Sequence, residues 1–73
     1  VLKQANLNEA NLKDAFLTGA NLEGANLSNT DLSKAELSGA NFRDAEMRQV
    51  NLSHADLTGA NLSGTNLRWA DLS

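Results

Sequence analysis

Residues 17–22 read LTGANL, residues 37–42 read LSGANF and residues 57–62 read LTGANL, so one six-residue stretch returns twice at a spacing of 20. Inside this spacing runs a shorter period of five. From Leu2 to Leu72, every fifth residue is large and apolar, and 13 of these 15 residues are leucine. Two residues before each of them except Leu2 lies a small residue, which is alanine at 11 of 14 positions. An internal repeat this strict determines the architecture before any other feature is considered.

A period of five fits neither a helix nor a flat strand. In an α-helix, five residues turn through about 500°, so successive leucines would be displaced by about 140° and would form no apolar stripe. In a strand, side chains alternate between two faces, so successive leucines would point in opposite directions. All the leucines can lie inside only if the chain turns a corner once per unit. Five residues per side and twenty per coil therefore predict a four-sided solenoid of about 3.65 coils.

Each corner is predicted to be a four-residue turn that runs from a leucine to the following alanine. Gly19, Gly39 and Gly59 take the third position of this turn. A type II turn requires a positive φ at that position, which glycine adopts without steric cost. Asn29 can adopt the same conformation. Four other corners carry residues that resist it, and there we expect other turn types: Glu9, Asp14, Lys34 and Trp69.

These features make the chain similar to the pentapeptide repeat family, whose motif is A-[N/D]-L-x-x. Residues 20–24 (ANLEG) and 55–59 (ADLTG) are good examples, and the resemblance covers essentially all of residues 1–73. It implies a right-handed quadrilateral β-helix, and it alone supplies the handedness. We expect a single all-β domain over residues 1–73. Because no polar cap closes the repeat, we expect either a fragment of a longer array or one end of an oligomer that self-associates through its terminal coils.

Composition narrows the class of partner. The net charge of −3, from nine acidic and six basic residues, leaves no footprint for direct nucleic-acid binding. The chain has no cysteine, so it can form no disulfide and no thiolate metal site. The sequence shows no signal peptide and no transmembrane run. We therefore expect no membrane partner and favour a cytoplasmic location. At a spacing of 20, Lys3, Glu23 and Arg43 alternate in sign, as stacked charges should.

No catalytic constellation is present. The single histidine, His54, shares its column with Asp14 and Lys34, whereas a metal site needs three or four convergent ligands. We interpret it as a solvated corner residue. No serine has a histidine–carboxylate pair to activate it. We therefore expect no enzymatic activity, no metal and no cofactor. The stacked Asn and Asp residues are expected to be structural, with side chains that can hydrogen-bond from coil to coil.

Four residues break the pattern and are candidates for an interaction surface. Phe16 replaces the usual Asn or Asp, and Trp69 occupies an outward corner position. Arg48 and Arg68 stack in register, which is unfavourable unless Glu46 neutralises part of the charge. Trp and Arg are enriched in binding hot spots. The alternative for the two aromatic residues is that flanking sequence covers them.

Two functions fit these observations. The first is a non-enzymatic rigid scaffold whose outer faces bind an unidentified protein partner. The second follows from the resemblance, because some pentapeptide repeat proteins mimic B-form DNA and bind DNA gyrase or topoisomerase IV, giving quinolone resistance. A solenoid about 17 Å long would need about ten negative charges to match DNA. The chain has a net charge of −3, and only the side that carries Glu36 and Asp56 has no basic residue. DNA mimicry is therefore the alternative to the scaffold.

Overall fold

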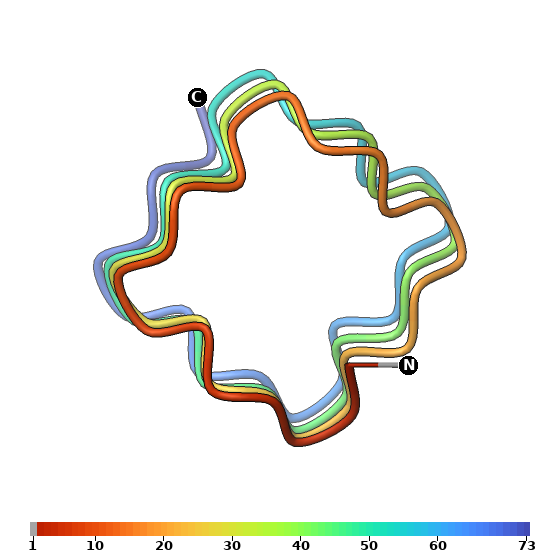
Figure 1. Cartoon of the computed structure of the whole chain (residues 1–73), viewed down its shortest axis with the longest axis vertical. Coiled ribbons are helices and arrows are strands. Elements are labelled where there is room, and N and C mark those ends of the chain that lie inside the picture. Colours follow the sequence, from red (N-terminus) through yellow and green to blue (C-terminus); the bar gives the residue numbers. More distant parts are fainter. Residues whose placement is uncertain (1) are drawn as a thin grey trace.

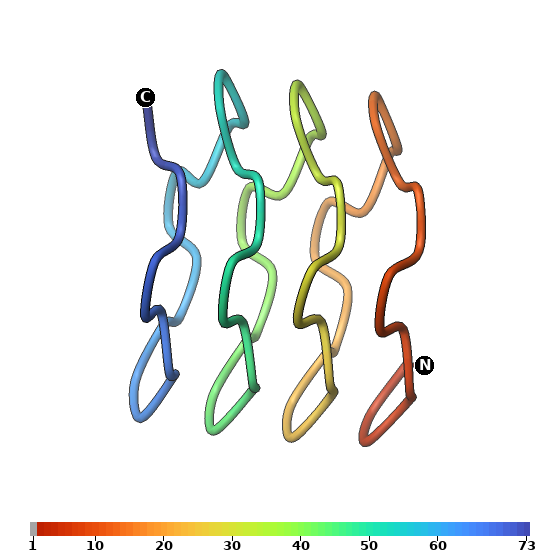
Figure 2. The same ribbon diagram turned by 90° about the vertical axis from the view of Figure 1, so that its left-hand side faces the viewer.

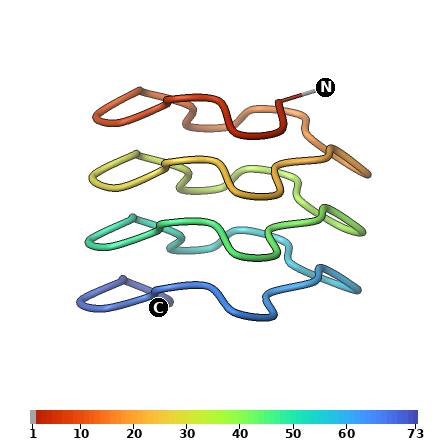
Figure 3. The same cartoon turned by 90° about the horizontal axis from the view of Figure 1, so that it is seen from below.

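The structure, a computed structural model, describes residues 2–73 as a four-sided coil that winds about one axis (Figure 1). Seen along this axis, the N-terminal coil lies nearest the viewer and the chain runs clockwise away from it, so the solenoid is right-handed. The side views show the coils stacked in order, with the two termini at opposite ends (Figures 2 and 3). The Cα positions extend over 23 × 22 × 19 Å, with the shortest extent along the axis. The molecule is therefore a block rather than a rod.

Isolated parallel β-bridges hold the sides of the coil together. Each bridge joins two residues that are 20 apart in the sequence, from the Asn6–Asn26 bridge to the Asn51–Asp71 bridge. The bridging residue is always the one that precedes a large apolar residue. Within residues 2–73 there is no helix, and no strand is longer than one bridging residue. The spacing confirms the predicted quadrilateral β-helix with 20 residues per coil.

Three backbone hydrogen bonds in each five-residue unit join neighbouring coils. Leu22 N–H donates to Asn41 C=O at 2.7 Å, and Gly24 N–H donates to Arg43 C=O at 2.9 Å. In the opposite direction, Asn41 N–H donates to Ala20 C=O at 2.9 Å. The same three bonds recur around the central coils. These bonds satisfy backbone N–H and C=O groups that folding removes from water.

Every corner has the same form. The N–H of the small residue donates to the C=O of the large residue three positions earlier, as Ala40 does to Leu37 at 3.0 Å. The third residue of the turn has a positive φ at all corners, between 68° and 71° in the glycines and between 59° and 65° in nine other residues. Gly19, Gly39 and Gly59 therefore adopt the predicted conformation, with φ of 71°, 71° and 70°.

The expectation of other turn types at four corners is wrong, because positive φ values also occur at Glu9, Asp14, Lys34 and Trp69. The inter-coil hydrogen bonds explain the difference. The N–H at this position points to a carbonyl of the next coil, as Lys34 N–H does to Ser53 C=O at 2.9 Å. Another turn type would break this bond and displace the leucines that follow. The ladder thus outweighs the strain of a left-handed non-glycine residue, on the order of 1–2 kcal/mol.

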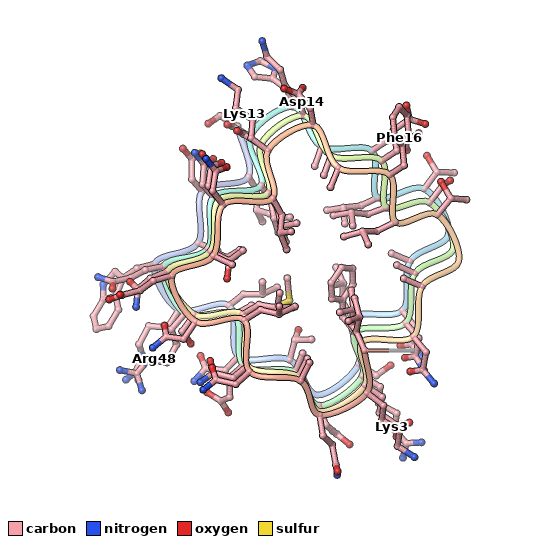
Figure 4. The ribbon with its side chains drawn as sticks, viewed as in Figure 1. Lys3, Lys13, Asp14, Phe16 and Arg48 are labelled. Carbon is pink, nitrogen blue, oxygen red and sulfur yellow. The ribbon has the colours of Figure 1, made fainter. Side chains whose placement is uncertain are left out.

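The large apolar side chains fill the interior (Figure 4). Leucines of the first and last coils are only half-buried, and Leu72 is 58% exposed, because these coils have a neighbour on one side only. The buried Thr30 hydroxyl donates to Leu7 C=O at 2.8 Å, so no buried side-chain polar atom of residues 2–73 lacks a partner. The large side chains of the central coils are fully buried: Leu22, Leu27, Leu32, Leu37, Phe42, Met47 and Leu52.

Candidate protein-interaction site

The residue before each large apolar residue stabilises its own corner. Asn or Asp at this position accepts a hydrogen bond from the backbone N–H two residues later, at 3.0–3.2 Å in all eleven cases. This arrangement is an Asx turn. The stacked amides are therefore structural, as expected. Within residues 2–73, the expected hydrogen bonds between stacked Asn and Asp side chains of adjacent coils do not form, because each short side chain bonds to its own turn instead.

Glutamate and phenylalanine break this row of Asx turns. Phenylalanine has no acceptor, and glutamate carries its carboxylate one methylene farther from the backbone. Glu46 extends instead along the solenoid axis, where its Oε1 accepts a bond from Asn66 Nδ2 at 3.5 Å. As a result, the backbone N–H two residues after Phe16, Glu36 or Glu46 donates to no protein acceptor; these are the N–H groups of Thr18, Ser38 and Arg48.

One of these open corners lies in a surface hollow. The hollow has a volume of about 310 Å³ and crosses three successive coils at one corner of the solenoid. Asn29 Nδ2 and Asn8 Oδ1, at 3.5 Å, connect the first two of these coils. Arg48 points outward at this corner (Figure 4). All of the lining residues are polar: Asn8, Asn26, Ser28, Asn29, Glu46, Arg48 and Gln49.

The structure brings three of the four predicted interface residues to this corner. Arg48 and Arg68 occupy one column in adjacent coils, and Trp69 follows Arg68 at the same corner. Arg68 Cζ lies 5.4 Å from the centroid of the Trp69 ring, a cation–π contact. Trp69 remains 69% exposed. Phe16 is 79% exposed but lies on another side of the solenoid, far from Arg48 (Figure 4), so it does not join this site.

The charge on Arg48 is not neutralised by the protein. The expected contact with Glu46 does not form, because the Glu46 carboxylate is turned toward Asn66. No other carboxylate of residues 2–73 lies within ion-pair distance of Arg48. The predicted alternation of charges is met only in part, since Arg43 pairs with its neighbour in sequence. Both ion pairs lie at another corner, Lys3 Nζ–Glu23 Oε1 at 3.9 Å and Arg43 Nε–Asp44 Oδ2 at 3.8 Å.

Three Asx turns lower the pKa of the aspartate that forms them. The Ser33, Thr58 and Ser73 hydroxyls, and then the N–H groups of the same residues, hold the pKa values of their carboxylate partners below the usual range; these are Asp31, Asp56 and Asp71. At Asp56, the hydroxyl of Thr58 lies 2.6 Å and its N–H 3.0 Å from the carboxylate oxygen. None of these aspartates lines the hollow. Their chemistry is that of turn stabilisation.

Within residues 2–73, no group of three or more histidine, aspartate or glutamate side chains has the arrangement of a metal site. No helix in this part of the chain has the length and apolar character needed to cross a membrane.

The sequence alone indicated Arg48, Arg68 and Trp69 but missed the other residues of the hollow. These residues have ordinary types for their positions, and only the stacking of three coils assembles them. One signal was available, because Glu46 interrupts a column that otherwise contains asparagine and the next outward residue is an arginine.

The chain has clear relatives. An eight-copy profile of pentapeptide repeats matches residues 1–39 and 35–73. The crystal structure of HetL, a pentapeptide repeat protein involved in heterocyst differentiation regulation in the cyanobacterium Nostoc sp. strain PCC 7120, is 35% identical in sequence. The match covers 93% of this chain with a TM-score of 0.59. The chain spans 36% of the length of HetL.

Two further solved structures are similar in sequence. Rfr23 from Cyanothece 51142 is 38% identical over 96% of this chain and 58% of its own length, with a TM-score of 0.44. The protein alr5209 from the same Nostoc strain is 33% identical over 89% of this chain and 62% of its own, with a TM-score of 0.38. No curated protein sequence matches this chain. Pentapeptide repeat proteins are generally non-enzymatic. The periodic leucines, the four-sided coil and the family profile together show that the chain belongs to the pentapeptide repeat family.

Proposed function

We propose that the chain is a rigid, non-enzymatic scaffold that binds a protein partner through the arginine corner, defined as Arg48, Arg68, Trp69 and the residues that line the hollow. The observation that carries the proposal is an exposed Trp69 ring, stacked on Arg68, beside a hollow that contains an unneutralised Arg48. Tryptophan and arginine supply much of the binding energy at protein interfaces. Trp69 is one of three large apolar side chains exposed within residues 2–73, with Phe16 and Leu72, and it alone is stacked against an arginine.

The backbone of the scaffold favours such a role. The hydrogen bonds between coils hold the outward residues of adjacent coils at a constant spacing, so the corner needs little reorganisation before binding. HetL shares the fold and is involved in the regulation of heterocyst differentiation. Regulation of that kind is compatible with a protein that acts by binding.

The test is a comparison of variants that change opposite sides of the solenoid. The immobilised chain is used to capture partners from a lysate, and a captured protein is then purified and titrated against each variant. We expect the triple variant Arg48→Ser, Arg68→Ser, Trp69→Ser to weaken binding by at least about tenfold, since hot-spot residues cost over 1 kcal/mol when truncated. Phe16→Ser should leave it unchanged. A partner that ignores the triple variant, or that is lost with Phe16→Ser alone, would refute the assignment.

DNA mimicry is the second candidate, and one observation favours it. Glu36 and Asp56 are exposed and bridge adjacent coils on the side of the solenoid that has no basic residue. DNA gyrase supercoiling, measured with and without the chain, separates the two functions. Inhibition that Glu36→Gln with Asp56→Asn abolishes would support mimicry. Gyrase that is unaffected by the chain would remove this candidate and leave the scaffold.

Self-association is a third proposal, for the 73-residue chain in solution. Leu72 is 58% exposed at the end of the coil, near Trp69 at the adjacent corner, so a second copy that stacks there would cover apolar surface. We expect the sedimentation coefficient to rise with protein concentration and to rise less for Trp69→Ser. A stable monomer at high concentration, unchanged by the substitution, would eliminate this proposal.

A further inference from the structure

We propose that the partner places a carboxylate side chain in the hollow, where it takes the position of the Asx oxygen that Glu46 does not provide. This inference rests on the proposed scaffold function, because it names the chemical group by which a partner would recognise the arginine corner. The donors are the open backbone N–H of Arg48 and the guanidinium of the same residue.

The missing oxygen is evident from the corners directly above and below. One coil earlier, Asn26 Oδ1 accepts the N–H of Ser28 at 3.1 Å, and one coil later, Asn66 Oδ1 accepts the N–H of Arg68 at 3.2 Å. Between them, the N–H of Arg48 has no acceptor in the protein. Glu46 and Arg48 both line the hollow, so the gap in the row opens onto it. An oxygen from a ligand would accept here the hydrogen bond that each neighbouring corner makes internally.

The unpaired Arg48 favours an acid over a neutral amide, and the Glu46 carboxylate, which also lines the hollow, is turned toward Asn66. Arg48 has no carboxylate partner, whereas the guanidinium of Arg68 lies over the Trp69 ring. The two arginines are one coil apart in the same column, and like charges in register repel. An anion beside Arg48 reduces that repulsion. Hydrogen bonds to a charged acceptor are also about twice as strong as neutral ones.

The hollow can hold more of the partner than one carboxylate. Its volume of about 310 Å³ leaves room for more than one carboxylate group. Asn26 and Gln49 line it and offer both amide donors and carbonyl acceptors, which suit a peptide backbone on either side of the acid. Trp69, in the next coil, is available to an apolar neighbour of that acid.

The corner at Glu36 serves as a control for this site. Glu36 leaves the N–H of Ser38 open in the same way that Glu46 leaves that of Arg48 open. The Glu36 side carries no basic residue, and none of its residues lines the hollow. It therefore has the open donor without the cation, and it should not attract a carboxylate. Glu46→Asn and Glu36→Asn are matched substitutions that restore an Asx turn at one corner or the other.

The experiment follows the backbone amide of Arg48 by ¹⁵N–¹H NMR at constant ionic strength. The probe is glutamate blocked as its N-acetyl, α-methylamide derivative, and the neutral control is the glutamine derivative. We expect the glutamate probe to shift this amide saturably and to bind at least about tenfold more tightly than the glutamine probe, because the acceptor is charged. Glu46→Asn should abolish the shift by filling the donor internally. Glu36→Asn should leave it unchanged, and Arg48→Gln should weaken it.

Several results would overturn the inference. They are an Arg48 amide that does not respond, a response that survives Glu46→Asn, and an equal response to the glutamine probe or to inorganic phosphate. If Glu46→Asn does not fold, the comparison of Arg48→Gln with Glu36→Asn decides. A purified partner that requires Trp69 while the Arg48 amide stays silent would leave the scaffold function intact and remove only the carboxylate. If the probe binds at Arg48 but a purified partner does not require the arginine corner, the carboxylate site remains and the proposed scaffold function at this corner is refuted.

Discussion

Lys34 offers a direct measurement of the strain that the ladder imposes on the corners. Its φ is 61°, its side chain is exposed, and that side chain forms no ion pair within residues 2–73. Lys34→Gly should relieve about 1–2 kcal/mol of left-handed strain and add about 0.5–1 kcal/mol of entropy cost in the unfolded chain. We expect a net gain of roughly 0.5–1 kcal/mol in the free energy of unfolding. Lys34→Ala removes the side chain but keeps the strain, so it should show no such gain.

The assay is urea unfolding followed by circular dichroism, with the slope of the transition unchanged among variants. In a chain of this size the gain corresponds to a rise in Tm of roughly 2–8 °C. Gly39, with a φ of 71° at an equivalent corner, supplies the reverse test, because Gly39→Ala should lose stability. If Lys34→Gly is no more stable than Lys34→Ala, or if Gly39→Ala is neutral, then the corners do not require a positive φ and the argument from the ladder fails.

Three further results are expected from the same unfolding measurements. Leu37→Ala, in the fully buried core, should lose about 2–5 kcal/mol, and a small loss would contradict the assigned interior. Gly64→Ala and Gly19→Ala should both lose stability, because each residue has a positive φ, and the losses should be similar, since the one close contact of a Cβ at Gly64 is the flexible end of the Asp44 side chain and one at Gly19 meets nothing within 4 Å; a neutral Gly64→Ala would contradict the strain at that corner. The pKa of Asp56 is lowered in the folded chain by the Thr58 hydroxyl, so its contribution is complete above the unfolded pKa of about 4 and is lost as the pH falls through the folded value. Unfolding between pH 7 and pH 3 should therefore show a smaller loss of stability for Thr58→Ala than for the wild type, and identical pH profiles would show that the bond is absent.

The repeat made most of the fold predictable. The five-residue period placed the large side chains inside, and the 20-residue period gave the spacing of every bridge. The position of the corners followed as well, since the turn from Leu37 to Ala40 was expected from the glycine between them. These features are encoded many times over, so each unit repeats the same information as its neighbours.

The exceptions depended on information that lies outside any one unit. The conformation of Lys34 is decided by a carbonyl in the next coil, so the preference of the residue itself was a poor guide. The direction of Glu46 depends on a side chain one methylene too long for its own turn and on an amide one coil away. The hollow beside Arg48 requires three coils to be in place. Reading the sequence unit by unit could therefore indicate the cations and the tryptophan but not the cavity.

The backbone hydrogen bonds between coils, and not the corner residues, impose the same turn at every corner. The residues at the surface can therefore vary without a change in the fold. Lysine, histidine and tryptophan all occupy the strained position at a φ of 60–61°. Two of every five positions can thus change in charge, size and polarity while the backbone that carries them keeps its path. In such a chain, adjacent coils hold variable outward side chains at a fixed spacing from one another. Grafting an acidic or aromatic pair onto the Gly39 side would then be a practical way to give the solenoid a second binding face.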